Sequence, residues 1–137
     1  MKEFIKDNLN LMLIISLIFI FPFFLWSGIS KIINFKKKVN ELQSKIPFFP
    51  KTLANISMIL VIILQILGPI ILLYSAIFYE NMSELLLIVV NIIIIIFLIF
   101  LIVVTILYHP INKQTTTFLR NTCYFGAFIL ILCLFNL

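Results

Sequence analysis

Charged residues are scarce in this sequence. Asp, Glu, Lys and Arg make up 11% of its 137 residues, whereas 64% of the residues are hydrophobic. A soluble domain carries about 25% charged residues, because its surface must face water. A chain with so little charge cannot cover a water-facing surface, so most of its surroundings must be lipid. The length suffices for a single domain.

Residues that form catalytic or metal sites are also few. The chain has one histidine, His109, with no further ligands near it at the spacing of a metal site. There is no glycine-rich phosphate loop, no nucleophile elbow and no pair of carboxylates. The two cysteines, Cys123 and Cys133, would lie about 15 Å apart in a helix, which is too far for a disulfide. These absences predict no metal and no cofactor and favour a non-enzymatic protein, while leaving enzymatic activity open.

Long uncharged runs are what the sequence has in abundance. A helix needs about 20 apolar residues to cross the ~30 Å hydrocarbon core of a membrane, and four runs are long enough. We therefore predict an all-α integral membrane protein, an antiparallel four-transmembrane-helix bundle formed by residues 1–137 as a single membrane domain. Continuous apolar runs exclude a β-barrel, whose strands alternate in short stretches. The expected spans are residues 9–30, 52–79, 85–109 and 115–137.

The first of these runs follows Lys2 and Lys6, an arrangement that signal peptides share. Its apolar stretch is longer than that of a signal peptide, and no small-residue cleavage site follows it. We therefore expect it to be retained as the first span, with a kink at Pro22 that neighbouring helices tolerate.

A polar segment lies between the first two spans. Within it Phe35, Val39 and Leu42 recur at helical spacing, and lysines occupy many of the other positions. This pattern predicts a short amphipathic helix over about 33–46, lying at the membrane interface with its apolar side chains toward the acyl chains. A solvated loop is the alternative. The lysines expected to contact anionic lipid headgroups are Lys36, Lys37 and Lys38.

Lysine and arginine are concentrated in the connections that follow the first and third spans. The opposite side has only Lys2 and Lys6. The positive-inside rule then places both connections in the cytoplasm and both termini outside. The net charge is +5, but the basic residues lie at span ends and in these connections, so they form no face for nucleic acid. The expected partners are the lipid bilayer, anionic headgroups and other membrane proteins.

Polar side chains within the spans are the places where function is expected, because each needs a partner away from lipid. With 3.6 residues per turn, each span has one narrow polar or small-residue face. We expect Ser27 and Gly126 to face the bundle interior together with the polar residues of the middle spans. Such faces either pack helices together or line a cavity for a ligand or redox group. The candidate intramembrane polar cluster consists of Gln65, Asn91, Thr105 and His109.

Short motifs lie in three of the predicted spans: Gly28-x-x-Lys31 at the end of the first, Gln65-x-x-Gly68 in the second, and Asn121 and Gly126 in the fourth. In this order they resemble the motifs of the DoxX-like family of four-helix integral membrane proteins. Gly28-x-x-Lys31 is similar to that family's Gly-x-x-Lys signature. Gln65-x-x-Gly68 stands where the family has Glu-x-x-Gly, so a neutral amide replaces an acid. The residues that carry the resemblance are Ser27, Gly28, Lys31, Gly68, Asn121 and Gly126.

The resemblance implies several functions and fixes none of them, because a fold does not determine an activity. Members of the family are linked to thiosulfate–quinone oxidoreduction, to membrane redox complexes and, more distantly, to cargo or chaperone roles. The basic residue that many members carry within the first helix is absent here, where Phe21-Pro22-Phe23-Phe24 stands. If that charge and the missing acid act together in the family, this chain has lost their chemistry.

We therefore expect a non-enzymatic scaffold or accessory subunit of a membrane complex. One alternative is a redox accessory subunit, in which amide and imidazole side chains of the candidate cluster bind the carbonyls of a quinone-like ligand. Another is a membrane cargo receptor or chaperone that recognises client helices through the same faces. A cavity lined by Gln65 and His109 would favour the quinone alternative, and a tightly packed bundle would favour the scaffold.

Overall fold

The computed structural model describes residues 4, 8–108 and 115–137 of the chain. Within these ranges, four helices are long and apolar enough to cross a membrane, which confirms the predicted all-α, multi-pass membrane fold. A short helix, α3, lies between the first two spans, and a single 3₁₀ turn, η1, follows the second span. The elements are α2 (Leu9–Ile33), α3 (Phe35–Lys45), α4 (Lys51–Ile77), η1 (Tyr79–Asn81), α5 (Glu84–Tyr108) and α6 (Thr115–Phe135).

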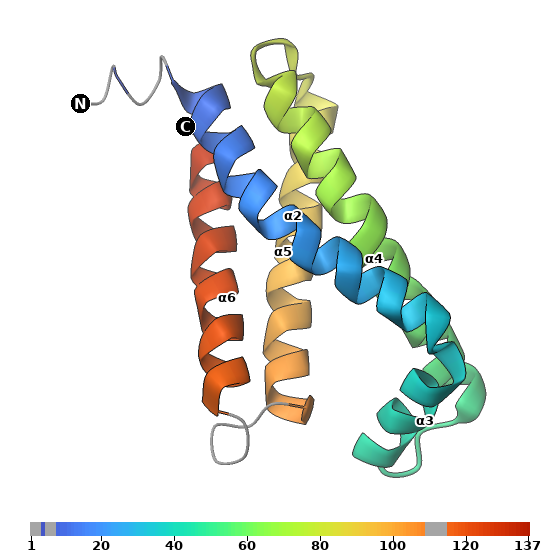
Figure 1. The fold of residues 1–137 in the computed structure, drawn as a ribbon. Helices are drawn as coiled ribbons and strands as arrows, with labels where there is room; N and C mark the ends of the chain where they lie inside the picture. The colour runs from blue at the N-terminus through green and yellow to red at the C-terminus, as the bar shows by residue number, and fades with distance from the viewer. Residues whose placement is uncertain (1–3, 5–7, 109–114) are drawn as a thin grey trace.

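The four spans form two pairs of neighbouring helices, α2 with α4 and α5 with α6 (Figure 1). The start of α2 and the end of α6 lie at one end of the bundle, and α3 lies at the other (Figure 1). The α3 end carries the lysines of the connection between α2 and α4. We call it the basic end.

Aromatic side chains fill the centre of the bundle. Phe24, Phe97 and Phe128, from three different helices, are each at most 1% exposed. The ring of Phe97 lies 4.9 Å from those of Phe24 and Phe128, measured between centroids. Gly68 allows α4 to approach this cluster, since a Cβ atom there would lie 2.6 Å from the Phe97 ring. These contacts join the two helix pairs. Helices in lipid gain no hydrophobic effect when they associate, so close packing and hydrogen bonds hold them together.

Helix α3 packs against protein on its apolar side. Val39 is 2% exposed and contacts Ala54 and Met58 in the first turns of α4, with Phe35 and Leu42 beside it. The prediction of a helix here is correct, but the expectation that Val39 points toward the acyl chains is wrong. The physical reason is that α4 begins close by, and its small side chain Ala54 allows α3 to pack against it.

The face that α6 turns inward differs from the predicted one. Gly126 is exposed, and a Cβ atom placed there would meet nothing within 4 Å. Its neighbours on that face, Thr122 and Cys133, are exposed as well. Asn121 and Phe128 are buried instead, and Phe128 lies about 200° around the helix from Gly126, at about 100° per residue. The expectation that Gly126 faces the interior is therefore wrong.

Candidate functional site

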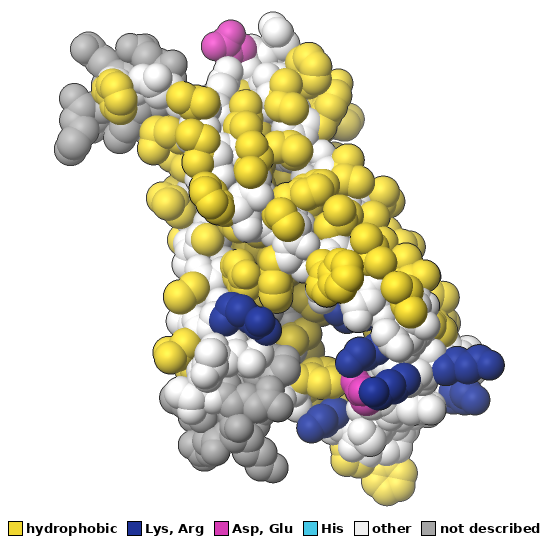
Figure 2. Space-filling view, viewed as in Figure 1, with side chains coloured by type: hydrophobic (Ala, Val, Ile, Leu, Met, Phe, Trp, Pro, Cys, Tyr) yellow, Lys and Arg dark blue, Asp and Glu magenta, His cyan; other side chains and the backbone are white. Residues whose placement is uncertain are grey.

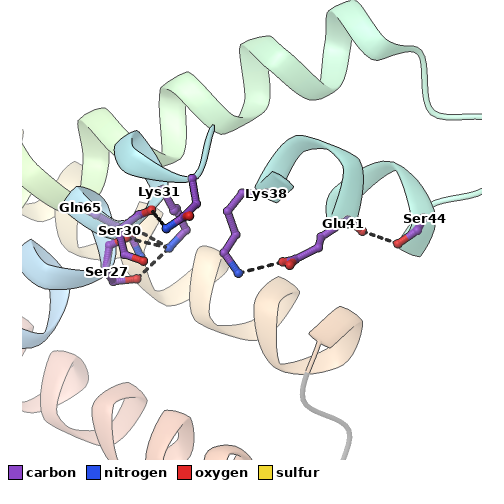
Figure 3. Close-up of polar contacts among 8 residues, drawn as sticks. Ser27, Ser30, Lys31, Lys38, Glu41, Ser44 and Gln65 are labelled. Atoms are coloured by element: carbon purple, nitrogen blue, oxygen red, sulfur yellow. Dashed lines mark hydrogen bonds and ion pairs between the residues drawn. The ribbon is translucent and has the colours of Figure 1, made fainter. Parts of the chain in front are cut away.

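Lys31, in the last turn of α2, joins two helices through its ammonium group. Its Nζ donates to Ser27 Oγ at 2.7 Å, one turn earlier on the same helix, and to Gln65 Oε1 of α4 at 2.9 Å (Figure 3). Gln65 is only 2% exposed. Ser27 and Lys31 face each other because residues four apart lie on one side of a helix. Gln65 is 34 residues away on another helix, so no local spacing pairs it with Lys31.

The ammonium of Lys31 has only neutral partners among the described residues. The ion pair that the structure records there joins Lys38 Nζ to Glu41 Oε2 at 2.8 Å, within α3 (Figure 3). A charge at membrane depth is costly unless it is paired or reaches water. Lys31 therefore leaves a positive charge at the basic end that no described carboxylate neutralises.

A cavity of about 590 Å³ opens next to Lys31 at the basic end. Its volume lies within the range of about 300–1,000 Å³ that is typical of small-molecule sites. Helices α2, α3, α4, α5 and α6 contribute side chains, and Gln65 and Asn121 are among the polar ones. The apolar wall includes Phe23, Phe24, Met58, Val61, Phe100, Leu101, Val104 and Leu107.

Basic side chains from three helices line this cavity. Lys31 comes from α2, Lys38 and Lys45 from α3, and Arg120 from α6, whereas Glu41 is the single acidic residue among the lining side chains of the described chain. Figure 2 shows dark-blue basic side chains on both sides of a hollow at this end of the molecule.

Two of these cations rest on aromatic rings that line the cavity. The guanidinium of Arg120 lies 4.9 Å from the ring centre of Phe23, and Lys45 Nζ lies 5.9 Å from that of Tyr108. Attraction between a cation and the face of an aromatic ring operates within about 6 Å. The ring contacts hold the two side chains near the cavity while their remaining N–H groups stay available to a ligand.

The members of the predicted polar cluster have different partners in the structure. Gln65 lines the cavity and binds Lys31. Thr105 Oγ1 accepts a hydrogen bond from Asn121 Nδ2 at 3.1 Å. Asn91 exchanges two amide hydrogen bonds, of 3.0 and 2.9 Å, with Asn136 near the end of α6. His109 lies outside the described residues.

The three lysines expected at lipid headgroups also differ from one another. Lys36 and Lys37 are exposed, whereas Lys38 is half-buried and lines the cavity. Glu41 and Lys45 were not among the functional residues expected from the sequence. Their spacing from Lys38, three and seven residues, could have placed all three on one face of α3. No local signal could have brought Arg120 of α6 to the same place.

Compared with protein-family models, with curated proteins and with solved structures, the chain gives no match. The four long apolar helices make it a multi-pass integral membrane protein. The resemblance to the DoxX-like family rests on the short motifs alone.

Proposed function

We propose that this protein is a non-enzymatic, DoxX-like accessory protein of a membrane, and that it holds an amphiphilic small molecule in the cavity at its basic end. The observation that carries this proposal is the combination of apolar walls with a polar group formed by Lys31 and Gln65. Binding sites for small molecules are mostly apolar, with a few polar groups that fix the orientation of the ligand.

The polar group supports binding over catalysis. Ser27 and Lys31 are a potential nucleophile and base at hydrogen-bond distance, but Lys31 also donates to Gln65. An ammonium has no lone pair with which to activate a serine hydroxyl. Asn91 pairs with Asn136 and does not line the cavity, whereas Gln65 does. The described members of the candidate cluster therefore support an amphiphile near Lys31 better than a quinone bound jointly by Gln65 and Asn91.

Filling the cavity tests the proposal. Val104 lines the cavity from α5, and Val104→Phe would occupy part of its volume. Ile99 lies on the same helix, is 56% exposed and does not line the cavity, so Ile99→Phe is the matched control. Each variant is purified in mild detergent, and retained amphiphiles are identified by mass spectrometry. We expect Val104→Phe to lose an amphiphile that the wild type and Ile99→Phe retain. Equal retention by both variants would refute the proposal.

A second candidate function, docking of another membrane protein, is supported by the outer face of α6. Thr122 and Gly126 are exposed one turn apart, and nothing lies within 4 Å of a Cβ atom at Gly126. Small residues spaced by four allow a second helix to approach closely in lipid. This face therefore suits the scaffold role expected from the sequence.

Docking on α6 predicts that Gly126→Leu releases a membrane protein that co-purifies with the wild type, because the larger side chain holds the partner helix away. Ile129→Leu keeps the size of an exposed side chain on the same helix and serves as the control. A partner that remains bound to Gly126→Leu must dock on another face.

A further inference from the structure

We infer that the occupant of the cavity is an anionic phospholipid whose phosphate lies among Lys31, Lys38, Lys45 and Arg120 and whose acyl chain lies along the apolar wall. This inference rests on the proposed binding function and specifies the ligand of that same cavity.

The charge of the cavity lining favours an anion. Four cationic side chains from α2, α3 and α6 line it. Glu41, the one carboxylate among the described lining residues, is paired with Lys38. A concave site with walls of low dielectric constant concentrates the field of charges of one sign. Lys31 strengthens this field, because both of its partners are neutral.

The distribution of the donors favours phosphate as the anion. Lys31 is placed by Ser27 and Gln65, and Arg120 is placed by the ring of Phe23. Their charges reach the cavity from two different helices. A phosphate offers several oxygens in different directions and can accept charge-assisted hydrogen bonds from separated donors.

The apolar wall favours a lipid over a soluble phosphate. Phe100, Leu101, Val104 and Leu107 extend along two turns of α5 and line the cavity beyond the basic side chains. A soluble phosphate compound would leave these side chains without a partner, whereas an acyl chain covers them. The positive-inside rule places the basic end at the cytoplasmic leaflet, where anionic lipids are concentrated.

The experiment compares lipids that share acyl chains and differ in the headgroup. The purified protein in mild detergent is mixed with phosphatidic acid or with diacylglycerol, and bound lipid is measured by native mass spectrometry. The variants are Lys31→Gln, Arg120→Gln and the double variant Lys31→Gln/Arg120→Gln. The control is Lys36→Gln/Lys37→Gln, which removes the same charge as the double variant from exposed positions on α3. Thermal unfolding of each variant reports whether it is folded.

We expect phosphatidic acid to bind more tightly than diacylglycerol, and the cavity double variant to weaken its binding on the order of tenfold, because two charges near the phosphate are lost. The exposed double variant should stay within about twofold of the wild type, since solvent screens its charges. Arg120 lies at an exposed position, so Arg120→Gln should remain folded and reduce binding even if Lys31→Gln unfolds.

Four results would overturn the inference in different ways. Equal binding of both lipids to the wild type would leave the cavity function standing and refute the anionic headgroup. Binding of neither lipid would refute the proposed function as well. Displacement of phosphatidic acid by glycerol 3-phosphate at similar concentration would show that a soluble phosphate suffices. An equal loss in the exposed and cavity double variants would assign the effect to general surface charge.

Discussion

The centre of the bundle and its basic end are built from the same four spans, yet one is closely packed and the other is hollow. At the centre, Phe24, Phe97 and Phe128 are almost completely buried, and Gly68 fits against a ring. At the basic end, a cavity of about 590 Å³ is lined by α3 and by both helix pairs. The difference shows that close packing holds the helices together at the centre and that the basic end contains open space.

Chemistry accounts for this difference. Aromatic rings meet edge to face or stacked and need no solvent, so three helices can converge on them. Among the described residues, four cationic side chains and one carboxylate line the cavity at the basic end. Charges of one sign cannot be packed against each other in lipid without an anion or water between them. The proposed anionic ligand would occupy the cavity between these charges.

The largest expected effect separates two phenylalanines on α5. Phe97 is fully buried at the centre, whereas Phe100, three residues later, borders the cavity. Phe97→Ala should reduce the free energy of unfolding by about 3 kcal/mol, because a void remains where the rings met. Phe100→Ala should reduce it by less than half as much, since that ring already faces open space. Unfolding by sodium dodecyl sulfate in mixed micelles measures both. Equal losses would mean that the two regions do not differ in packing.

A pair of glycines gives the next largest contrast. Gly68→Ala should destabilise the bundle by about 1–3 kcal/mol, because its methyl group would overlap the Phe97 ring and force α4 and α5 apart. Gly126→Ala should cause no loss and a small gain, since the site is open and alanine favours helix. The same unfolding assay applies. A loss at Gly126 similar to that at Gly68 would contradict the outward orientation of this α6 face.

The hydrogen bond between Lys31 and Gln65 should give a smaller, coupled effect. Gln65→Leu leaves the Lys31 ammonium with Ser27 as its remaining partner, and Lys31→Met removes the ammonium altogether. The double variant should be more stable than the sum of the single losses predicts, by about 1–2 kcal/mol, because no unpaired charge remains. Additive losses in the mixed-micelle assay would show that the bond does not join α2 to α4.

The smallest effect is expected where two amides pair at the end opposite the lysines. Asn91 and Asn136 exchange two hydrogen bonds. A double-mutant cycle with Asn91→Leu and Asn136→Leu should give a coupling of about 0.6 kcal/mol, the average for hydrogen bonds between membrane helices. A coupling energy larger than that between Lys31 and Gln65 would show that the stronger hydrogen bonding between helices lies at this end and not at the basic end.

The fold followed from the sequence because membrane spans depend on local composition. Each apolar run became a helix close to its expected bounds, with α2 continuing to Ile33 rather than ending at residue 30. The short helix α3 followed from its spacing of apolar residues in the same way. The contacts of the candidate site could not be predicted from the sequence. Gln65 is buried, as expected of a polar residue within a span, but the sequence did not identify Lys31 as its partner.

Local sequence therefore accounts for the four spans, the basic connection and the polar positions, because hydrophobicity and helical period act over a few turns. Packing between distant helices accounts for the rest. It turned Asn121 inward and Gly126 outward, paired Asn91 with Asn136, and brought Lys31, Lys45 and Arg120 to one cavity. The physical reason is that the inward face of each helix depends on how the bulky rings of several helices fit together. That fit is a property of the assembled bundle and is not contained in any single segment.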